Sequence, residues 1–274
     1  MKLRTLFFLA LFTLSETASY AEISVICSSF PAYDFTRQIT GALADVKLLL
    51  PPGIDPHDFE PSPSDIKALN DADAFVFTGP ELEAWALKIS ASLRNTRIIN
   101  ASEGIALINN DPHIWLDLSL AQKMTANILN SLCEVDPDNS KSYTLNANSF
   151  CSKLNELDDA FMAVKKKRAL VFADEFSAGY FVRRYGFDYV SAFDGENEPS
   201  VRRMAEILKY IREHKTRYIF ADTSEAPSVT REISTQSGAG ILVFGTGHRV
   251  YDTSKTFLEI MTENYRNIQE AMND

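Results

Sequence analysis

The sequence predicts an α/β protein with two lobes, in which parallel-type sheets are joined by one long rigid helix. Short β-branched segments alternate with amphipathic helical segments in both halves of the chain, as is typical of parallel sheets covered by helices. Between the two halves, residues 140–167 contain neither proline nor glycine and carry apolar residues at helical spacing. We therefore expect lobes at 22–137 and 168–274, with a linking helix at 138–167.

The N-terminal half shows four apolar segments that are typical of buried strands. Helices are expected from Pro31 to about Thr40, from Ser62 after a proline-rich loop, and from Leu118 to Cys133. The expected strands are 22–30, 45–51, 74–79 and 96–100.

The C-terminal half repeats the alternation of strand and helix. A stretch from Ser200 to His214 is strongly amphipathic, and the chain closes with a helical pattern that ends near Met272. The strands expected here are 169–175, 188–193, 216–222 and 240–245, and the helices are 176–186, 200–214, 226–238 and 253–272.

The first residues predict a secretory signal peptide at 1–21. Lys2 and Arg4 precede an apolar run from Leu6 to Leu14, and small residues precede a cleavage position after Ala21. The apolar run is shorter than the ~20 residues that a membrane-spanning helix needs. We therefore expect an exported, periplasmic protein that is not membrane-embedded.

Net charge argues against some classes of binding partner, and cysteine content argues against a disulfide-rich fold. The formal net charge of −10 makes nucleic acid and anionic membranes poor partners. Three cysteines, an odd number, do not indicate a disulfide framework.

Three of the four histidines follow predicted strands directly. His57, His113 and His248 lie in such loops, whereas His214 lies near the end of an amphipathic helix and is expected to be a surface residue. Ligands of open α/β sheets bind outside the carboxyl ends of the strands. The three loop histidines are therefore candidates for one site.

The tripeptide Asp-Pro-His occurs twice, at 55–57 and at 111–113. Proline stiffens the approach to each histidine, and a neighbouring carboxylate can accept a ring N–H and fix the tautomer, as partners of metal-binding histidines do. A single loop histidine is usually a surface residue, but two in the same rigid context indicate a metal site.

Three segments resemble the periplasmic zinc- or manganese-binding proteins of ABC transporters (the solute-binding protein 9 type). These are GIDPHDFEPSPSDIKALNDADAFVFTGPELEAW, which includes Glu83 and Trp85, then DPHIWLDL, and finally YRNIQEAM. The resemblance covers essentially the whole mature chain. It implies a protein that captures a divalent metal ion between two lobes and delivers it to an inner-membrane permease with its ATPase.

The resemblance also implies a ligand set. His57 and His113 match the first two ligands, and Glu175 matches the third by its spacing to Phe181, with Asp174 as the alternative.

The family usually has an aspartate as fourth ligand in the loop after the last strand, and this chain departs from that pattern. His248 is the best-placed donor there, and Asp252 is the alternative. Asp55 and Asp117 are expected to orient the ligands.

Imidazoles with a carboxylate suit zinc or manganese and also accept iron, so the metal stays open. The expected form is a monomeric binding protein, not an enzyme. The alternative is an exported zinc-dependent hydrolase whose open coordination position holds water. Against it, the sequence has no HExxH motif and no evident general base.

Overall fold

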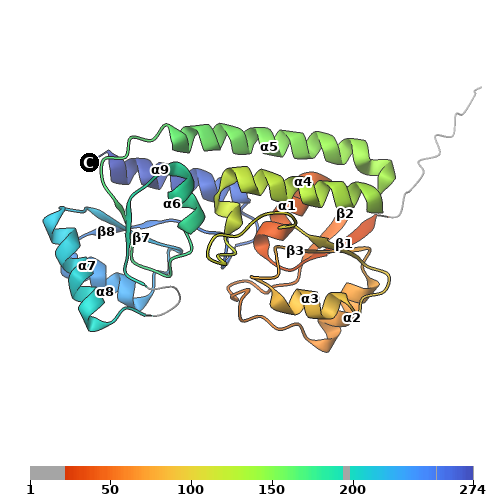
Figure 1. The fold of residues 1–274 in the computed structure, drawn as a ribbon, viewed down its shortest axis with the longest axis horizontal. Helices are drawn as coiled ribbons and strands as arrows, with labels where there is room; N and C mark the ends of the chain where they lie inside the picture. Colours follow the sequence, from red (N-terminus) through yellow and green to blue (C-terminus); the bar gives the residue numbers. More distant parts are fainter. Residues whose placement is uncertain (1–21, 194–197, 251, 274) are drawn as a thin grey trace, which may run out of the picture.

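The structure is a computed structural model that describes residues 22–193, 198–250 and 252–273. The predicted signal peptide at 1–21 lies outside the described residues. The chain forms two lobes side by side, and one long helix lies along both of them (Figure 1).

The N-terminal lobe is built on a four-stranded sheet in which all pairs are parallel. Its strands are β1 (Ile23–Cys27), β2 (Ala44–Leu48), β3 (Ala74–Phe77) and β4 (Arg97–Asn100), in the order β2-β1-β3-β4. The β3 strand, AFVF, is buried at every residue, as expected for a central parallel strand.

The C-terminal lobe repeats this arrangement with a second parallel sheet. Its strands are β5 (Leu170–Phe172), β6 (Tyr189–Ser191), β7 (Tyr218–Ala221) and β8 (Gly240–Val243), in the order β6-β5-β7-β8. The predicted fold class, two α/β lobes with parallel sheets, is therefore confirmed.

Helices of the N-terminal half cover the first sheet. A capping box opens α2, in which the Ser62 side chain accepts from the amide of Asp65 and the Asp65 carboxylate accepts from the amide of Ser62. The sequence prediction missed the short helix α3, whose seven residues have no side-chain cap. The four helices are α1 (Phe30–Thr40), α2 (Pro63–Asp71), α3 (Ala84–Ser90) and α4 (Leu118–Val135).

The long helix α5 (Ser140–Met162) joins the lobes and is shorter than the expected range of 138–167. Its buried stripe runs from Tyr143 to Phe161 at spacings of three and four residues, and the helix ends one residue after that stripe. It packs against α4 and α1 of the N-terminal lobe and against the C-terminal helix α9 (Phe257–Met272).

Three shorter helices complete the C-terminal lobe: α6 (Gly179–Tyr185), α7 (Val201–Glu213) and α8 (Ser228–Ser237). In the part of the chain that the structure describes, no helix is both long and apolar enough to cross a membrane.

Hydrogen bonds also connect the two lobes. The indole Nε1 of Trp115 donates to the carbonyl of Thr246 at 2.7 Å, and the amide of Ile108 donates to the Tyr180 hydroxyl at 2.9 Å. One apolar core contains buried residues from α1, α4, α5, α6 and α9. The lobes are therefore held by shared packing as well as by the linking helix.

A buried polar cluster connects the carboxyl ends of β1 and β3. The Glu83 carboxylate accepts from the Ser28 hydroxyl at 2.5 Å and from the Gly79 amide at 3.0 Å, and the Ser29 hydroxyl lies 2.6 Å from that of Thr78. Burial raises the pKa of Glu83 to about 7, although these hydrogen bonds oppose the shift. The native protein therefore keeps Glu83 protonated at pH values at which the unfolded chain is ionised there.

The cost of opening the core under α5 can be measured at Phe161. This ring is fully buried and contacts Phe181, Tyr185 and Tyr265, with centroids 4.9, 5.0 and 5.4 Å away. We expect Phe161→Ala to lower the free energy of unfolding by about 3–5 kcal/mol because it leaves a cavity. Met162→Ala is the matched control, since Met162 is 45% exposed. Equal losses in urea unfolding of the two variants would contradict this assignment of the core.

Glu83 predicts a specific pH dependence of stability. Its native pKa of about 7 lies above the ordinary value of 4.5, so the native state binds more protons than the unfolded state between these values. Stability from this group is therefore present at low pH and is lost as the pH rises through that window. Relative to Glu83→Gln, we expect wild-type unfolding free energy to fall by up to about 1.4 kcal/mol per pH unit. A constant difference from pH 5 to pH 8 would contradict this.

Candidate metal centre

Three histidine side chains meet where the two lobes face each other. His57 comes from the loop after β2, His113 from the segment after β4, and His248 from the loop after β8. Their ring centroids lie 5.9 Å (His57–His113), 5.1 Å (His57–His248) and 4.9 Å (His113–His248) apart. One nitrogen from each ring lies within 4.8 Å of the other two. The structure thus brings together all three histidines that the sequence placed after strands.

The orientation of His113 is set by the aspartate two residues before it. Asp111 Oδ1 lies 2.7 Å from His113 Nδ1 and also accepts from the His113 amide at 3.0 Å. In this Asp-Pro-His tripeptide, the aspartate therefore orients the ring of the histidine two residues later. The other nitrogen, Nε2, is buried and has no hydrogen-bond partner among the described residues.

His248 reaches the site from the loop after β8. Gly247 precedes it with φ 72°, a left-handed conformation that favours glycine. Burial lowers the pKa of His248 to about 4, against the opposing effect of nearby Asp55. The imidazole is therefore neutral at pH 7, which is the form that binds a metal.

Asp55 lies between the two lobes. It accepts from the His57 amide at 2.8 Å. Its Oδ1 also lies 3.1 Å from His248 Nε2, a contact that is not aligned as a hydrogen bond in the described structure. Its Oδ2 accepts from Arg249 Nε at 3.0 Å and is also bonded by Nη2 of that arginine. Burial opposes ionisation of Asp55, but contacts with His248, the His57 amide and Arg249 outweigh it and hold the pKa of Asp55 well below its usual value.

Glu175 follows β5 and approaches the histidines from the C-terminal lobe. An oxygen of Glu175 lies within 4.8 Å of ligand atoms of both Asp55 and His248. Its Oε2 accepts from Arg249 Nη2 at 3.1 Å. Arg249 therefore connects one carboxylate from each lobe.

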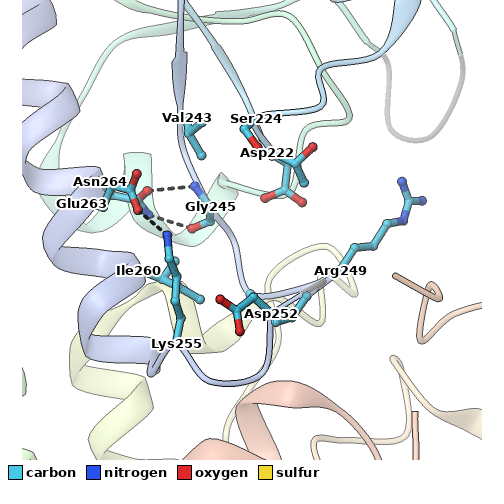
Figure 2. Close-up of a pocket in the computed structure, with 13 residues that line it drawn as sticks. Asp222, Ser224, Val243, Gly245, Arg249, Asp252, Lys255, Ile260, Glu263 and Asn264 are labelled. Atoms are coloured by element: carbon cyan, nitrogen blue, oxygen red, sulfur yellow. Dashed lines mark hydrogen bonds and ion pairs between the residues drawn. The ribbon is translucent and has the colours of Figure 1, made fainter. Parts of the chain in front are cut away.

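The alternative ligands Asp174 and Asp252 have other contacts. Asp174 accepts from the amides of Glu175 and Asp222, at 2.8 and 3.2 Å. Asp252 accepts from the amide and hydroxyl of Ser254, at 3.0 and 2.6 Å. In Figure 2 the Asp252 carboxylate and the Arg249 guanidinium point to opposite sides of the loop. Neither aspartate belongs to the two groups of potential metal ligands found in the described chain.

Asp117 was expected to orient the metal ligands, but its recorded contacts are with α4 and Arg184. Its carboxylate caps α4 by accepting from the Ser119 and Leu120 amides, and it lies 3.2 Å from Arg184 Nε. Asp111, not Asp117, is the carboxylate that contacts the His113 ring. His214 lies elsewhere, on the exposed end of α7, with its ring stacked on Tyr210 at 3.9 Å.

Two residues near the site were not singled out from the sequence. Asp222 directly follows β7, and burial raises its pKa to about 6; its Oδ1 accepts from the Thr246 amide at 2.7 Å. Its position after a strand was the available signal. Arg249 carried no such signal, because its partners Asp55 and Glu175 are 194 and 74 residues away in the chain.

The arrangement suits a small, borderline-soft cation. Two nitrogens bonded to a tetrahedral zinc at about 2.1 Å are about 3.4 Å apart, so rings already within 4.8 Å need only small movements. The buried Nε2 of His113 would gain a partner that it lacks in the described structure, and the buried Nε2 of His248 would gain a better-placed one than Asp55. The neighbouring carboxylates add negative charge on the same side.

Comparison with known proteins agrees with this geometry. The family model described as "Zinc-uptake complex component A periplasmic" matches residues 25–271. The "High-affinity zinc uptake system protein ZnuA" of Bacillus subtilis is 29% identical over 280 residues, covering 92% of this chain and 88% of that protein. The "Zinc-binding protein AdcA" of Streptococcus pyogenes is 26% identical, covering 93% of this chain but only 57% of its own length.

A solved structure shows the same fold. The Zn(II)-bound ZnuA-like domain of Streptococcus pneumoniae AdcA superposes with a TM-score of 0.81 at 26% identity, covering 93% of this chain and all of that domain. The family match extends over nearly all the described residues, from β1 to α9. This chain therefore belongs to the family of periplasmic zinc-uptake complex components A.

Proposed function

We propose that this protein is the extracytoplasmic binding component of an ABC transporter, and that it captures one zinc ion between its lobes for delivery to the permease. The observation that carries the proposal is the convergence of three imidazoles: the buried Nε2 of His113 has no hydrogen-bond partner in the described structure, and that of His248 meets Asp55 Oδ1 at 3.1 Å without a well-aligned hydrogen bond. Unpaired buried nitrogen atoms are costly unless a ligand satisfies them.

His57, His113 and His248 are the proposed ligands. Glu175, which the family resemblance predicts as a further ligand, and Asp55 are the carboxylates within reach of His248. Asp111 holds the His113 ring so that Nε2 faces the metal, as carboxylate partners of zinc-binding histidines do.

Zinc is favoured over manganese and iron. The relatives described above are named for zinc uptake or zinc binding. Three imidazoles also suit zinc better than they suit manganese, which prefers oxygen ligands.

The cellular setting follows from the same proposal. We expect export through the segment at 1–21, residence outside the cytoplasm as a monomer, and docking to a membrane permease with its ATPase. A relative in Streptococcus pneumoniae is described as a zinc-binding lipoprotein.

The hydrolase alternative depended on an open coordination position that holds water. The relatives named above are described by zinc uptake and zinc binding, not by hydrolysis. A transport protein is therefore the function that we propose.

Zinc titration of histidine variants tests the ligand set. We expect one zinc ion per wild-type chain, and we expect His57→Ala, His113→Ala and His248→Ala each to weaken binding by more than the roughly 10–100-fold that follows loss of a supporting partner. Competition with a chelator of known affinity gives the constants. His214→Ala is the control and should bind as wild type, since its ring stacks on Tyr210 at the surface. Wild-type affinity in all three site variants would refute the site.

A second comparison separates the two aspartates near His113. We expect Asp111→Asn to weaken zinc binding by about 10–100-fold because the His113 ring loses its carboxylate partner. Asp117→Ala should leave the zinc affinity unchanged and lower the free energy of unfolding by about 1 kcal/mol through loss of the α4 cap. The reverse pattern would show that Asp117 supports the site, as the sequence suggested.

A further inference from the structure

Arg249 places a permanent positive charge inside the proposed zinc site. It follows His248 directly, and its guanidinium contacts Asp55 from the N-terminal lobe and Glu175 from the C-terminal lobe. The loop after β8 thus carries His248 and Arg249 side by side, one a candidate metal donor and the other a cation.

The contacts of Arg249 use atoms that a metal ion would otherwise use. Oxygens of Asp55 and Glu175 and a nitrogen of His248 lie within 4.8 Å of one another and form a second potential metal-binding group. Arg249 bonds both carboxylates of this group and none of the three histidines in any contact that the structure records. The guanidinium thus occupies the oxygen donors and leaves the nitrogen donors to the metal.

Burial of these side chains strengthens Arg249 in its competition with a metal ion for the two carboxylates. The side chains of Asp55 and Glu175 are 11% and 18% exposed, and that of Arg249 is 38% exposed. Ion pairs with partly buried carboxylates are weakened less by solvent than pairs at the surface. An incoming cation must therefore displace a well-placed guanidinium before either carboxylate can bind it.

We propose that Arg249 is a specificity-determining residue: by retaining Asp55 and Glu175 it makes the cargo site a three-imidazole site and disfavours manganese relative to zinc. The proposal rests on the zinc-binding function proposed above. Manganese depends on oxygen donors, whereas zinc is bound well by imidazole nitrogens. Glu175, the carboxylate expected as a ligand, is then a partner of Arg249 in the loaded protein.

Arg249→Gln tests the proposal by freeing both carboxylates. We expect its manganese affinity to rise by at least about tenfold relative to its zinc affinity, because the site gains oxygen donors. Lys255→Gln is the matched control: it removes one positive charge from the same loop region, but Lys255 pairs with Glu263. The ratio of the zinc and manganese constants in Lys255→Gln should equal that of wild type.

Glu175→Gln provides a second test in which Arg249 stays intact. In the wild-type background we expect it to change the zinc affinity by less than about threefold, because Glu175 is bound to Arg249 and not to metal. In the Arg249→Gln background it should remove most of the gain in manganese affinity. A large loss of zinc binding in the single Glu175→Gln variant would show that zinc displaces Arg249, and would overturn the proposal.

The two proposals fail in different ways. Wild-type protein that binds neither metal would refute the zinc-binding function itself. Wild-type protein that binds zinc, with an unchanged zinc-to-manganese ratio in Arg249→Gln, would refute only the role of Arg249. An equal change of ratio in Lys255→Gln would assign the effect to overall charge and would also refute it.

Discussion

The site depends on one constraint: the carboxyl ends of two separate parallel sheets are held at a fixed distance by a core that both lobes share. The helix α5 packs against α4 and α1 on one side and against α9 of the C-terminal segment. Trp115 and Tyr180 add hydrogen bonds between the lobes. Loops that leave the strands can therefore bring side chains from distant parts of the chain together with little freedom to drift.

Asp55 shows how closely the two lobes are coupled at the site. It accepts from the backbone of its own loop at His57 and contacts His248 and Arg249 across the lobe boundary. The Asp55 carboxylate thus holds the loop of His57 and also contacts the ring of His248. A change in the separation of the lobes would alter both contacts at once.

Much of the fold was predictable because its signals are local. The β3 strand is a continuous apolar run, α2 begins with a serine cap, and the linking helix lacks proline and glycine. The short helix α3 was missed because seven residues without a side-chain cap leave little pattern. The stretch 163–167 was included in the linking helix, yet the buried stripe of α5 already ends at Phe161.

The site was predictable in part for the same reason. Strand-end positions and the Asp-Pro-His repeat located His57, His113 and His248, which the structure places together. Arg249 was invisible because its contacts exist only after the lobes are assembled. Asp117 was expected beside the ligands, but the capping of α4 and the contact with Arg184 are what the structure shows for it. Local sequence patterns thus identify the candidate metal-binding histidines, whereas a charged neighbour such as Arg249 can be located only from the tertiary structure.

The position of Trp115 has an optical consequence. Its ring lies 5.3 Å from that of His113, and its Nε1 donates to the carbonyl of Thr246, two residues before His248. An indole so placed senses the charge and orientation of an adjacent imidazole, and the second tryptophan, Trp85, lies apart from it against Phe59 and Phe75. We therefore expect the intrinsic fluorescence of Trp115 to report changes at His113, between the lobes, without an added label.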